Sequence, residues 1–475
     1  MKIKSLFFFF SIIFFFLGCV PKIEKVETTK DSQIIDELKI IDINEGKNLS
    51  TNWWQIFGDE QLNLIISKAL NQSYNLKSIE QRFKKANTII KAIESQNLPN
   101  ISFESSLTKE RFSENHIFPA PLGGGIFNEY HSATTLEYKF DFWNERKSKI
   151  LSAKNLALAQ KAFIENAKLN LEMAICETYL SWNYNEKKIE YIDKIIEVLY
   201  EELEIIKQKY DVGLIDEITL NKKKAQIAQM QFNEYSIKEI IKGQITTLTI
   251  LSGQLPSFSQ NLIKPNIKEN ISISLPNDVY LNFLSKRADI AIQKYIVLSN
   301  EENINVAKTK FYPNINLNVL LGFTSFISND FITKASSVPS AGFALDLPIF
   351  DWGKREANLE DGVITYNSSV YEYNEILIKA VNEVFEVLKK LEYKELQIKM
   401  HHKQLESNEI NEKIAGKRFD IGLNDKISYN DSKIDTLIVH LNQMDLIESR
   451  VKLELNLIKS IGGGFKEEDL TNVKG

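Results

Sequence analysis

Few residues in this chain of 475 have the types and spacing that chemistry at a site requires. Among its five histidines, only His401 and His402 are neighbours, and adjacent helical residues point in different directions. There is no H-E-x-x-H motif, and Gly123-Gly124-Gly125 beside two prolines predicts a loop tip rather than a phosphate site. We therefore expect no enzyme activity, no catalytic or metal-ligating residue, and no cofactor.

The two cysteines call for separate interpretations. Cys176 lies within a long helical stretch, where a packed thiol is the expectation. Cys19 follows Lys2, Lys4 and an apolar run of twelve residues, Leu6–Leu17, a pattern typical of a secretory signal peptide. Twelve residues are too few to span a bilayer, which needs about 20.

The end of this apolar run resembles the cleavage box of bacterial lipoproteins. Phe16-Leu17-Gly18-Cys19 has the small residue and the cysteine of that box, with Phe16 where leucine is usual. The resemblance implies a signal peptide over 1–18 and a lipid anchor, such as palmitate, on Cys19. The alternative is an ordinary signal peptide that happens to contain a cysteine.

Composition excludes several classes of protein. Hydrophobic residues make up 43% and charged residues 25%, which is typical of a folded chain. The net charge is −5, and no run of five basic residues occurs, so nucleic acid is not an expected partner.

The chain also contains an internal duplication. An offset of 209 residues links Trp143 to Trp352, Gly213 to Gly422 and Gly253 to Gly462, and an offset of 214 links Leu98–Ile101 to Tyr312–Ile315. We expect two repeats, over 60–256 and 278–464, joined by a linker over 257–277. Residues 19–59 form the N-terminal segment and 465–475 the tail.

The placement of glycine and proline predicts very long helices. No Gly or Pro occurs over 144–212, and only two glycines occur over 354–421, so each stretch can form one helix of about 67 residues, roughly 100 Å long. The second carries apolar residues at coiled-coil spacing: Val363, Tyr366, Val370, Tyr373, Leu377, Ala380, Val384, Val387 and Leu391. Shorter antiparallel helices return to Gly253 and Gly462, and helices over 60–97 and 278–311 lead into the repeats.

Between the leading and long helices, each repeat predicts a β-hairpin, over about 100–140 and 314–349. Its strands alternate apolar and polar residues, which suits a membrane barrel with lipid outside and water inside. A soluble sandwich, or a sheet packed on helices, is the alternative. Because open edges in lipid leave backbone groups unpaired, four strands require further copies, and a dimer, trimer or tetramer would each close the sheet.

Several motifs together resemble the TolC-like outer-membrane efflux proteins, in the lipid-anchored branch that serves resistance-nodulation-division pumps. The matching segments are Trp53–Leu62, Lys209–Gly213, Lys286–Ile290, Phe311–Pro313 and Leu347–Gly353. The resemblance implies a mainly α fold with a small β part: a homotrimeric α-barrel/β-barrel duct in the outer membrane, each chain a duplication of helix, β-hairpin, long helix and helix. It would passively export small molecules, working with a periplasmic adaptor (membrane fusion protein) and an inner-membrane transporter.

Two alternatives to this function stay open. One is a type I exit duct for secreted proteins, and the other, of a different class, is a lipid-anchored coiled-coil adaptor or structural protein without a pore. The alternating hairpins discriminate between these classes, since an adaptor needs no lipid-facing strands.

The resemblance also implies site residues. The helix-to-helix tips at Gly213, Leu214, Gly422 and Leu423 match the family's adaptor-docking motif. Acidic residues beyond the second tip narrow the channel in this family, and here Asp431 matches one position while Ser428 replaces the other acid. We expect Asp431 and Asp425 to form the constriction. The alternative is that both are ordinary solvated residues.

Overall fold

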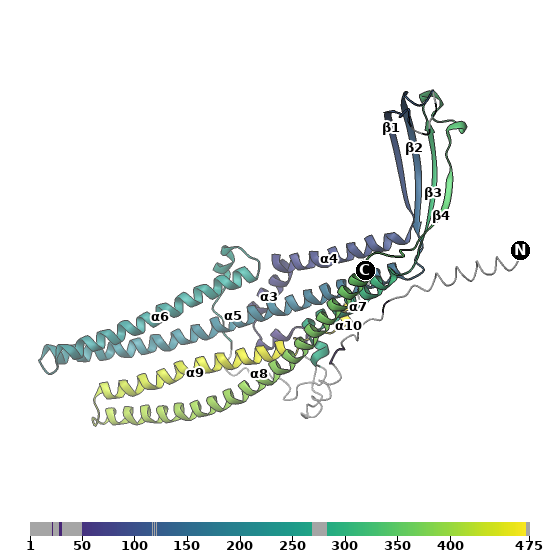
Figure 1. The fold of residues 1–475 in the computed structure, drawn as a ribbon. Coiled ribbons are helices and arrows are strands. Elements are labelled where there is room, and N and C mark those ends of the chain that lie inside the picture. Colours follow the sequence, from purple (N-terminus) through teal and green to yellow (C-terminus); the bar gives the residue numbers. More distant parts are fainter. Residues whose placement is uncertain are drawn as a thin grey trace. The chain divides into compact units, whose positions relative to one another are not determined.

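The computed structural model describes residues 21, 28–30, 50–115, 117, 119, 121–267 and 283–471, which form long helices and one small sheet (Figure 1). The main elements are α3 (Glu60–Gln72), α4 (Tyr74–Glu94), β1 (Asn100–Arg111), β2 (Ile126–Lys139), α5 (Glu145–Asp211), α6 (Glu217–Leu251), α7 (Ala288–Thr309), β3 (Asn314–Ser325), β4 (Ser340–Asp346), α8 (Lys354–Asp420), α9 (Lys426–Ser460) and α10 (Glu468–Thr471). Short 3-10 turns include η1 (Trp53–Phe57) and η4 (Phe283–Lys286).

The chain separates into two compact units. One consists chiefly of Phe83–Ala159 and Gln293–Tyr373, and holds the sheet with α4, α7 and the first parts of α5 and α8. The other consists chiefly of Lys30–Arg82, Gln160–Ile292 and Asn374–Gly475, and holds the remaining helical parts.

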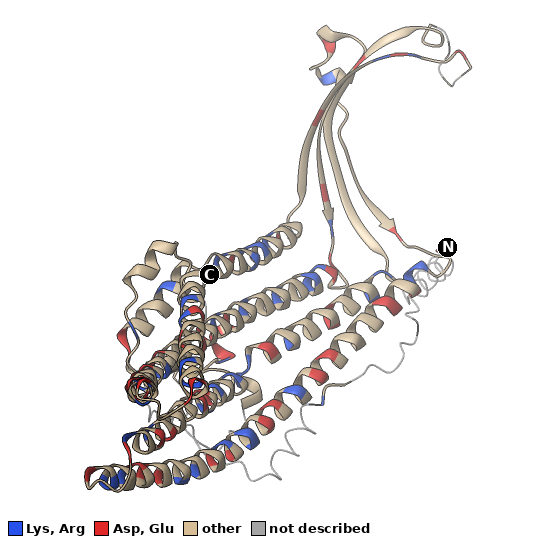
Figure 2. Ribbon diagram, turned by 90° about the vertical axis from the view of Figure 1, so that its left-hand side faces the viewer, with Lys and Arg blue, Asp and Glu red and all other residues tan. Residues whose placement is uncertain are grey.

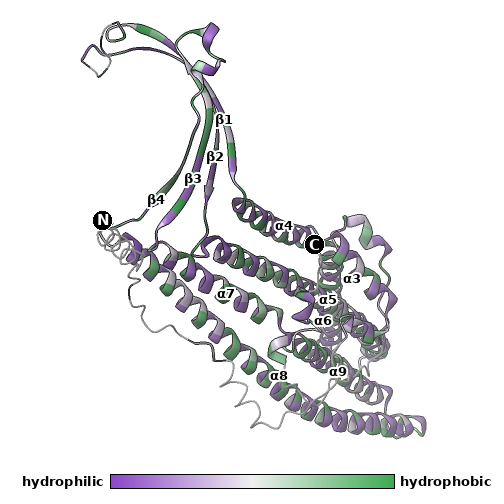
Figure 3. Ribbon diagram, turned by 90° about the vertical axis from the view of Figure 1, so that its right-hand side faces the viewer, coloured by the Kyte–Doolittle hydropathy of each residue, from purple (hydrophilic) through white to green (hydrophobic). Residues whose placement is uncertain are grey.

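The sheet has the antiparallel order β1-β2-β3-β4. The two hairpins therefore lie side by side through β2 and β3, which come from different repeats. Charged side chains are sparse along these strands and dense along the helices (Figure 2). Hydrophilic and hydrophobic residues alternate along the strands, whereas the helices carry both kinds throughout (Figure 3).

Both predicted long helices are present and uninterrupted. α5 and α8 have 67 residues each, and α6 and α9, which follow their tips, have 35 each. The apolar stripe of α8 is buried at Val370, Leu377 and Ala380, and becomes half-buried toward Leu391. The coiled-coil pattern thus identified the packed side of this helix.

The prediction of single leading helices was wrong. The first leading segment divides into α3 and α4 at Ser73, where the backbone leaves the helical region (ψ 118°) and the Ser73 hydroxyl accepts a hydrogen bond from Leu76 N at 3.4 Å. Gly253 packs against this break, since a Cβ on it would lie 2.8 Å from the carbonyl oxygen of Gln72.

The second repeat has the same interruption at the equivalent place. There η4 ends before α7 begins at Ala288, and Gly462 lies so close to the carbonyl of Lys286 that an added Cβ would clash with it. Arg287 fills the junction, with its guanidinium donating to Ser460 O at 3.0 Å and pairing with Glu383 at 2.9 Å.

The largest apolar core lies in the second unit. The Trp53–Leu62 motif contributes Trp53, Trp54, Phe57 and Leu62, all buried against α5. Asp59 caps α3 by accepting from Leu62 N at 2.8 Å, and Gln61 donates to the Tyr179 hydroxyl at 2.9 Å. The motif therefore holds residues 53–62 against the helices of this unit.

Candidate functional site

The strand register separates the sheet into an apolar and a polar face. Leu136 lies opposite Ile101 on one side and Val319 on the other, and Tyr138 lies opposite Leu317. Since residues paired across antiparallel strands point the same way, these side chains share one face. Most polar positions of the hairpins occupy the other face, where Ser102 and Thr135 hydroxyls lie 2.7 Å apart.

Among the residues that the structure describes, the two outer strands have no partner at their outer edges. β1 pairs only with β2, and β4 only with β3. All residues of β1 and β4 are exposed, including Phe103 and Phe343, whereas β3 is mostly half-buried. Unpaired strand edges are templates for pairing with another chain.

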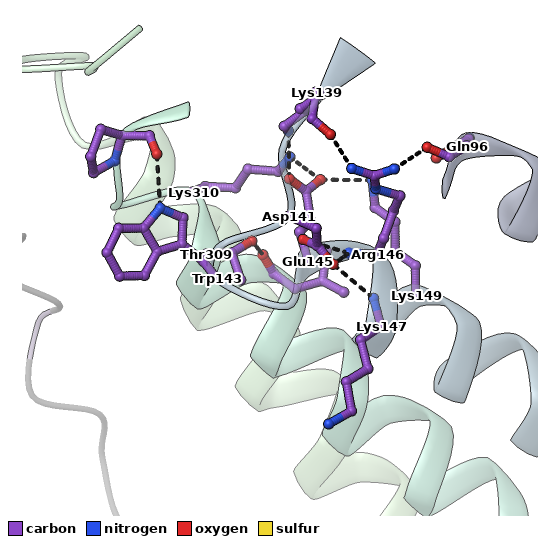
Figure 4. A network of polar contacts seen from close by, with 12 residues as sticks. Gln96, Lys139, Asp141, Trp143, Glu145, Arg146, Lys147, Lys149, Thr309 and Lys310 are labelled. Atoms are coloured by element: carbon purple, nitrogen blue, oxygen red, sulfur yellow. Dashed lines mark hydrogen bonds and ion pairs between the residues drawn. The ribbon is translucent and has the colours of Figure 1, made fainter. Parts of the chain in front are cut away.

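A carboxylate with three lysine partners lies where β2 gives way to α5 (Figure 4). Glu145 is bonded by Lys139 at 2.7 Å, by Lys149 at 2.7 Å and by Lys310 at 2.5 Å, and its side chain is only 8% exposed. Burial would raise the pKa of Glu145, but the hydrogen bonds from the lysines outweigh it and lower that pKa to about 2.

The neighbouring Arg146 and Trp143 complete this junction (Figure 4). The Arg146 guanidinium donates to the carbonyls of Gln96 and Lys139, and the Trp143 indole donates to Pro313 O at 2.8 Å. Asn144 takes a left-handed backbone (φ 61°) to make the turn. The junction thus joins the end of the first hairpin to the start of the second.

A cavity of about 440 Å³ adjoins these residues on the polar side of the sheet. Its lining comes from the strands and from the junction: Glu137, Lys139, Glu145, Arg146, Asn316 and Asn318 are among its residues. The junction residues could not be recognised as a cluster from the sequence, because Lys310, the third partner of Glu145, lies 165 residues away.

At the helix tips, Gly213 and Gly422 take the left-handed conformation, with φ of 74° and 75°. Leu214 N donates to Lys209 O, and Leu423 N donates to Arg418 O, which is the bonding of a glycine-terminated helix end. The side chains of Leu214 and Leu423 are 74% and 66% exposed. The glycines have a backbone role, while the leucines offer apolar surface.

The two predicted constriction residues have different environments. Asp425 caps α9, accepting from Ser428 N at 2.9 Å and from its hydroxyl at 2.6 Å, and lies 3.6 Å from Lys209. The hydrogen bonds from Ser428 lower the Asp425 pKa. Capping thus accounts for Asp425 without a pore role.

Asp431, the other predicted constriction residue, is exposed on α9 near two further acids of α5. Burial raises the pKa of Glu202 despite its ion pair with Lys223, and the charges of Asp431 and Glu201 raise it further. Acidic side chains from two helices therefore gather close to this tip.

A buried acid that sequence analysis missed lies deep in α5. Trp53 Nε1 donates to Glu172 at 3.3 Å, and burial raises the pKa of Glu172 to about 8. Cys176, on the next turn, is fully buried, as expected for a packed thiol, and burial raises its pKa. No sequence signal identifies Glu172, since its burial depends on a tryptophan 119 residues away.

Other sequence predictions have different outcomes. Cys19 lies outside the described residues. Within the described ranges, no three His, Cys, Asp or Glu side chains gather so that they could hold a metal ion. None of the helices in the described part has the length and hydropathy of a membrane-spanning helix.

Comparison with known proteins identifies the family. The family model described as "Outer membrane efflux protein" matches residues 65–254 and 279–463, most of the chain and both repeats. This chain belongs to the outer membrane efflux protein family. It is an outer-membrane efflux duct rather than an enzyme, as the sequence predicted, and the pore-free adaptor alternative loses its support.

Similar proteins extend over nearly the whole of this efflux protein. The multidrug resistance outer membrane protein MdtQ of Escherichia coli O157:H7 is 23% identical, covering 96% of this chain and 97% of its own. In structure, the CmeC outer membrane channel of Campylobacter jejuni aligns with a TM-score of 0.82 at 21% identity, covering 94% of both chains. VceC of Vibrio cholerae aligns with a TM-score of 0.80 at 24% identity, covering 88% of this chain and 100% of its own.

Proposed function

We propose that this efflux protein is a lipid-anchored homotrimer that exports small toxic molecules, such as drugs, as the exit duct of a tripartite pump. The observation that carries the proposal is the four-stranded sheet with two unpaired edges in an outer-membrane protein. Lipid offers no hydrogen bonds to an open edge, so further copies must close the sheet. Three copies supply twelve strands, the number that the family resemblance implies.

The partners follow from the same proposal. An inner-membrane resistance-nodulation-division transporter provides the energy and selects the substrate, and a periplasmic adaptor joins it to the duct. Relatives named for multidrug resistance favour small molecules over secreted proteins as cargo. Residues 1–18 serve as the signal peptide, and Cys19 carries the lipid in the outer membrane.

Within the duct, the helix tips dock the adaptor and an acidic ring closes the periplasmic end. Exposed Leu214 and Leu423, with Gly213 and Gly422 setting the turns, supply the docking surface. Asp431 supplies the ring, because one inward carboxylate per copy places three like charges around a narrow axis and favours cations. Asp425 contributes less to the ring, because its carboxylate already caps α9 and lies close to Lys209.

Conductance of the purified protein in planar bilayers tests whether it forms a channel and whether an acidic ring narrows that channel. We expect cation-selective channels that multivalent cations block from the periplasmic side, and we expect Asp431→Asn to relieve the block. Asp425→Asn is the matched comparison, since it removes a charge that already has Ser428 and Lys209 as partners. No conductance at all would refute the duct. Block and selectivity that survive both substitutions would refute the acidic ring alone.

A further inference from the structure

The pairing of the two hairpins inside this chain predicts how the outer strands of two neighbouring copies would pair. Within the chain, β2 ends the first hairpin and β3 begins the second, and they pair directly. The remaining edges are β4, which ends the second hairpin, and β1, which begins the first. The internal duplication therefore makes β4 the counterpart of β2, and β1 the counterpart of β3.

The internal boundary is sealed by an aromatic side chain and by continued strand pairing. The Trp143 ring stacks on Tyr312, with centroids 4.6 Å apart, and its indole donates to Pro313 O. Phe140 N donates to Ile315 O at 3.0 Å, so pairing continues beyond the end of β2. Trp143 and Tyr312 are half-buried as a result, and Pro313 is buried.

Within the described part of the chain, the counterparts of these residues do not contact one another in this way, and the Trp352 ring instead meets Phe350 edge-on, with centroids 4.6 Å apart. Trp352, the counterpart of Trp143, is 89% exposed, and Leu98, the counterpart of Tyr312, is 70% exposed. Pro99, the counterpart of Pro313, is also exposed. The chain therefore has both sets of contact residues, Trp352 next to β4 and Leu98 and Pro99 next to β1, but they lie at opposite edges of its sheet.

We propose that Trp352 seals the boundary with the next copy of this chain, packing on Leu98 and donating its indole N–H to the carbonyl of Pro99. This inference rests on the proposed oligomeric duct and specifies its contact surface. The 209- and 214-residue offsets convert the β2–β3 register into a β4–β1 register. Ala344 then lies opposite Ser106 of the next copy, and Phe343 lies opposite Leu107.

The faces of the strands provide an independent check on this register. Phe343 belongs to the apolar face, since it pairs with Leu317, and Leu107 belongs to it through Tyr130. The transferred register places them together and keeps one apolar face across the boundary. A slip of one residue would turn every side chain of the incoming strand to the wrong face.

The boundary between copies differs from the internal one in charge. Glu145 and Lys310, which pair across the internal boundary, have Lys354 and Gln96 as counterparts. The Glu145–Lys310 ion pair therefore has no equivalent between these counterparts. Strand pairing and Trp352 take its place at the boundary between copies.

Paired cysteines test the register. Since Phe140 and Ile315 form a hydrogen-bonded pair, the transferred pattern makes Ala344 and Ser106 a non-hydrogen-bonded pair, whose Cα atoms lie about 4.5 Å apart. The double variant Ala344→Cys/Ser106→Cys, made with Cys176→Ala, should form intermolecular disulfides on oxidation in native membranes. The control Ala344→Cys/Thr108→Cys, whose diagonal spacing a disulfide cannot span, should yield at least about ten-fold less.

The outcomes separate this inference from the proposed function. Covalent oligomers from the matched pair alone, ending at the size of a trimer, support both. A trimer by native mass in which the control pair cross-links equally well or better overturns the register and leaves the duct standing. A folded monomer in detergent overturns the proposed function itself.

A second set of variants tests Trp352. Trp352→Ala should lower the temperature at which the oligomer dissociates on native gels, and Trp352→Phe should lower it less, because the ring is kept and only the N–H is lost. Ile332→Ala, which removes a side chain that is 75% exposed in the loop between β3 and β4, is the control. Dissociation temperatures that do not differ between Trp352→Ala and this control would overturn the role of Trp352.

Discussion

Two buried glutamates illustrate how opposite environments tune the same side chain. Glu145 is surrounded by three ammonium groups, which hold its pKa at about 2. Glu172 is buried among apolar residues with one indole donor, and its pKa rises to about 8. At neutral pH the first carboxyl is charged and stabilising, and the second is mostly protonated.

We predict that Glu145→Gln destabilises the protein at neutral pH by up to about 3 kcal/mol, because the three lysines stabilise the charged carboxylate whose pKa they lower to about 2. A lowered folded-state pKa gives stability that is complete above the unfolded pKa of about 4.5 and is lost as pH falls toward 2. The difference in Tm between wild type and variant should therefore shrink over that range. Glu375→Gln, at an exposed pair with Lys379, should leave Tm unchanged.

For Glu172→Gln we predict the opposite sign. A raised folded-state pKa means that wild type loses stability as pH rises from about 4.5 to about 8, and the neutral amide does not. The variant keeps an acceptor for Trp53 and should gain on the order of 2–4 kcal/mol at pH 8 and above. Thermal unfolding followed by circular dichroism at pH 5 and pH 8.5 measures this. An equal Tm difference at both pH values would contradict it.

At the scale of elements, the two repeats use the same devices at equivalent places. Asp216 caps α6 and Asp425 caps α9, each through a hydroxyl residue three positions later. Gly253 and Gly462 each pack closely against the end of a leading helical segment, at Gln72 and at Lys286. Because α6 and α9 are capped in the same way, the two helical hairpins have similar turns, and both tips present similar surfaces.

The exposed leucines at these tips, Leu214 and Leu423, are the residues we expect to contact the adaptor. Leu214→Trp and Leu423→Trp should abolish drug resistance of cells while trimer assembly, followed by native mass, stays intact, because the bulkier ring disturbs docking and not the helix end. Leu255→Trp, at a residue that is 77% exposed just after α6, should preserve resistance. Full resistance in both tip variants would place adaptor docking elsewhere.

At the scale of the whole molecule, the chain is made of two similar halves that leave one open edge each. The internal boundary satisfies β2 and β3, and the same chemistry remains available at β4 and β1. In the proposed oligomer, other copies close this sheet, so that its backbone groups are satisfied in lipid. A lipid on Cys19 would add attachment without being needed for closure.

Cys19→Ala should therefore abolish labelling of the protein by a radioactive fatty acid, and the oligomer should still form in the outer membrane. Cys176→Ala is the matched control and should keep the label, because the Cys176 thiol is fully buried. Labelling that persists in Cys19→Ala would disprove the anchor. Labelling that disappears together with the oligomer would mean that the lipid is required for assembly.

Much of this fold could be predicted from local sequence. The near absence of Gly and Pro over 144–212 and 354–421 predicted α5 and α8, because helices tolerate almost any other residue. Period-two alternation predicted the apolar face of each hairpin, and the recurring offsets predicted two repeats. The family motifs then predicted the outer-membrane efflux function, which the family comparison confirmed.

Only the tertiary structure brought together residues that are distant in sequence. Lys310 reaches Glu145 across 165 residues, and Trp53 reaches Glu172 across 119. The helix break at Ser73 combines a local cap, the Ser73 hydroxyl bonded by Leu76 N, with the distant Gly253, whose backbone lies against Gln72 there. Periodicity records which side of an element is buried, whereas the charge state of a buried acid and the end of a helix depend on which distant group packs against it.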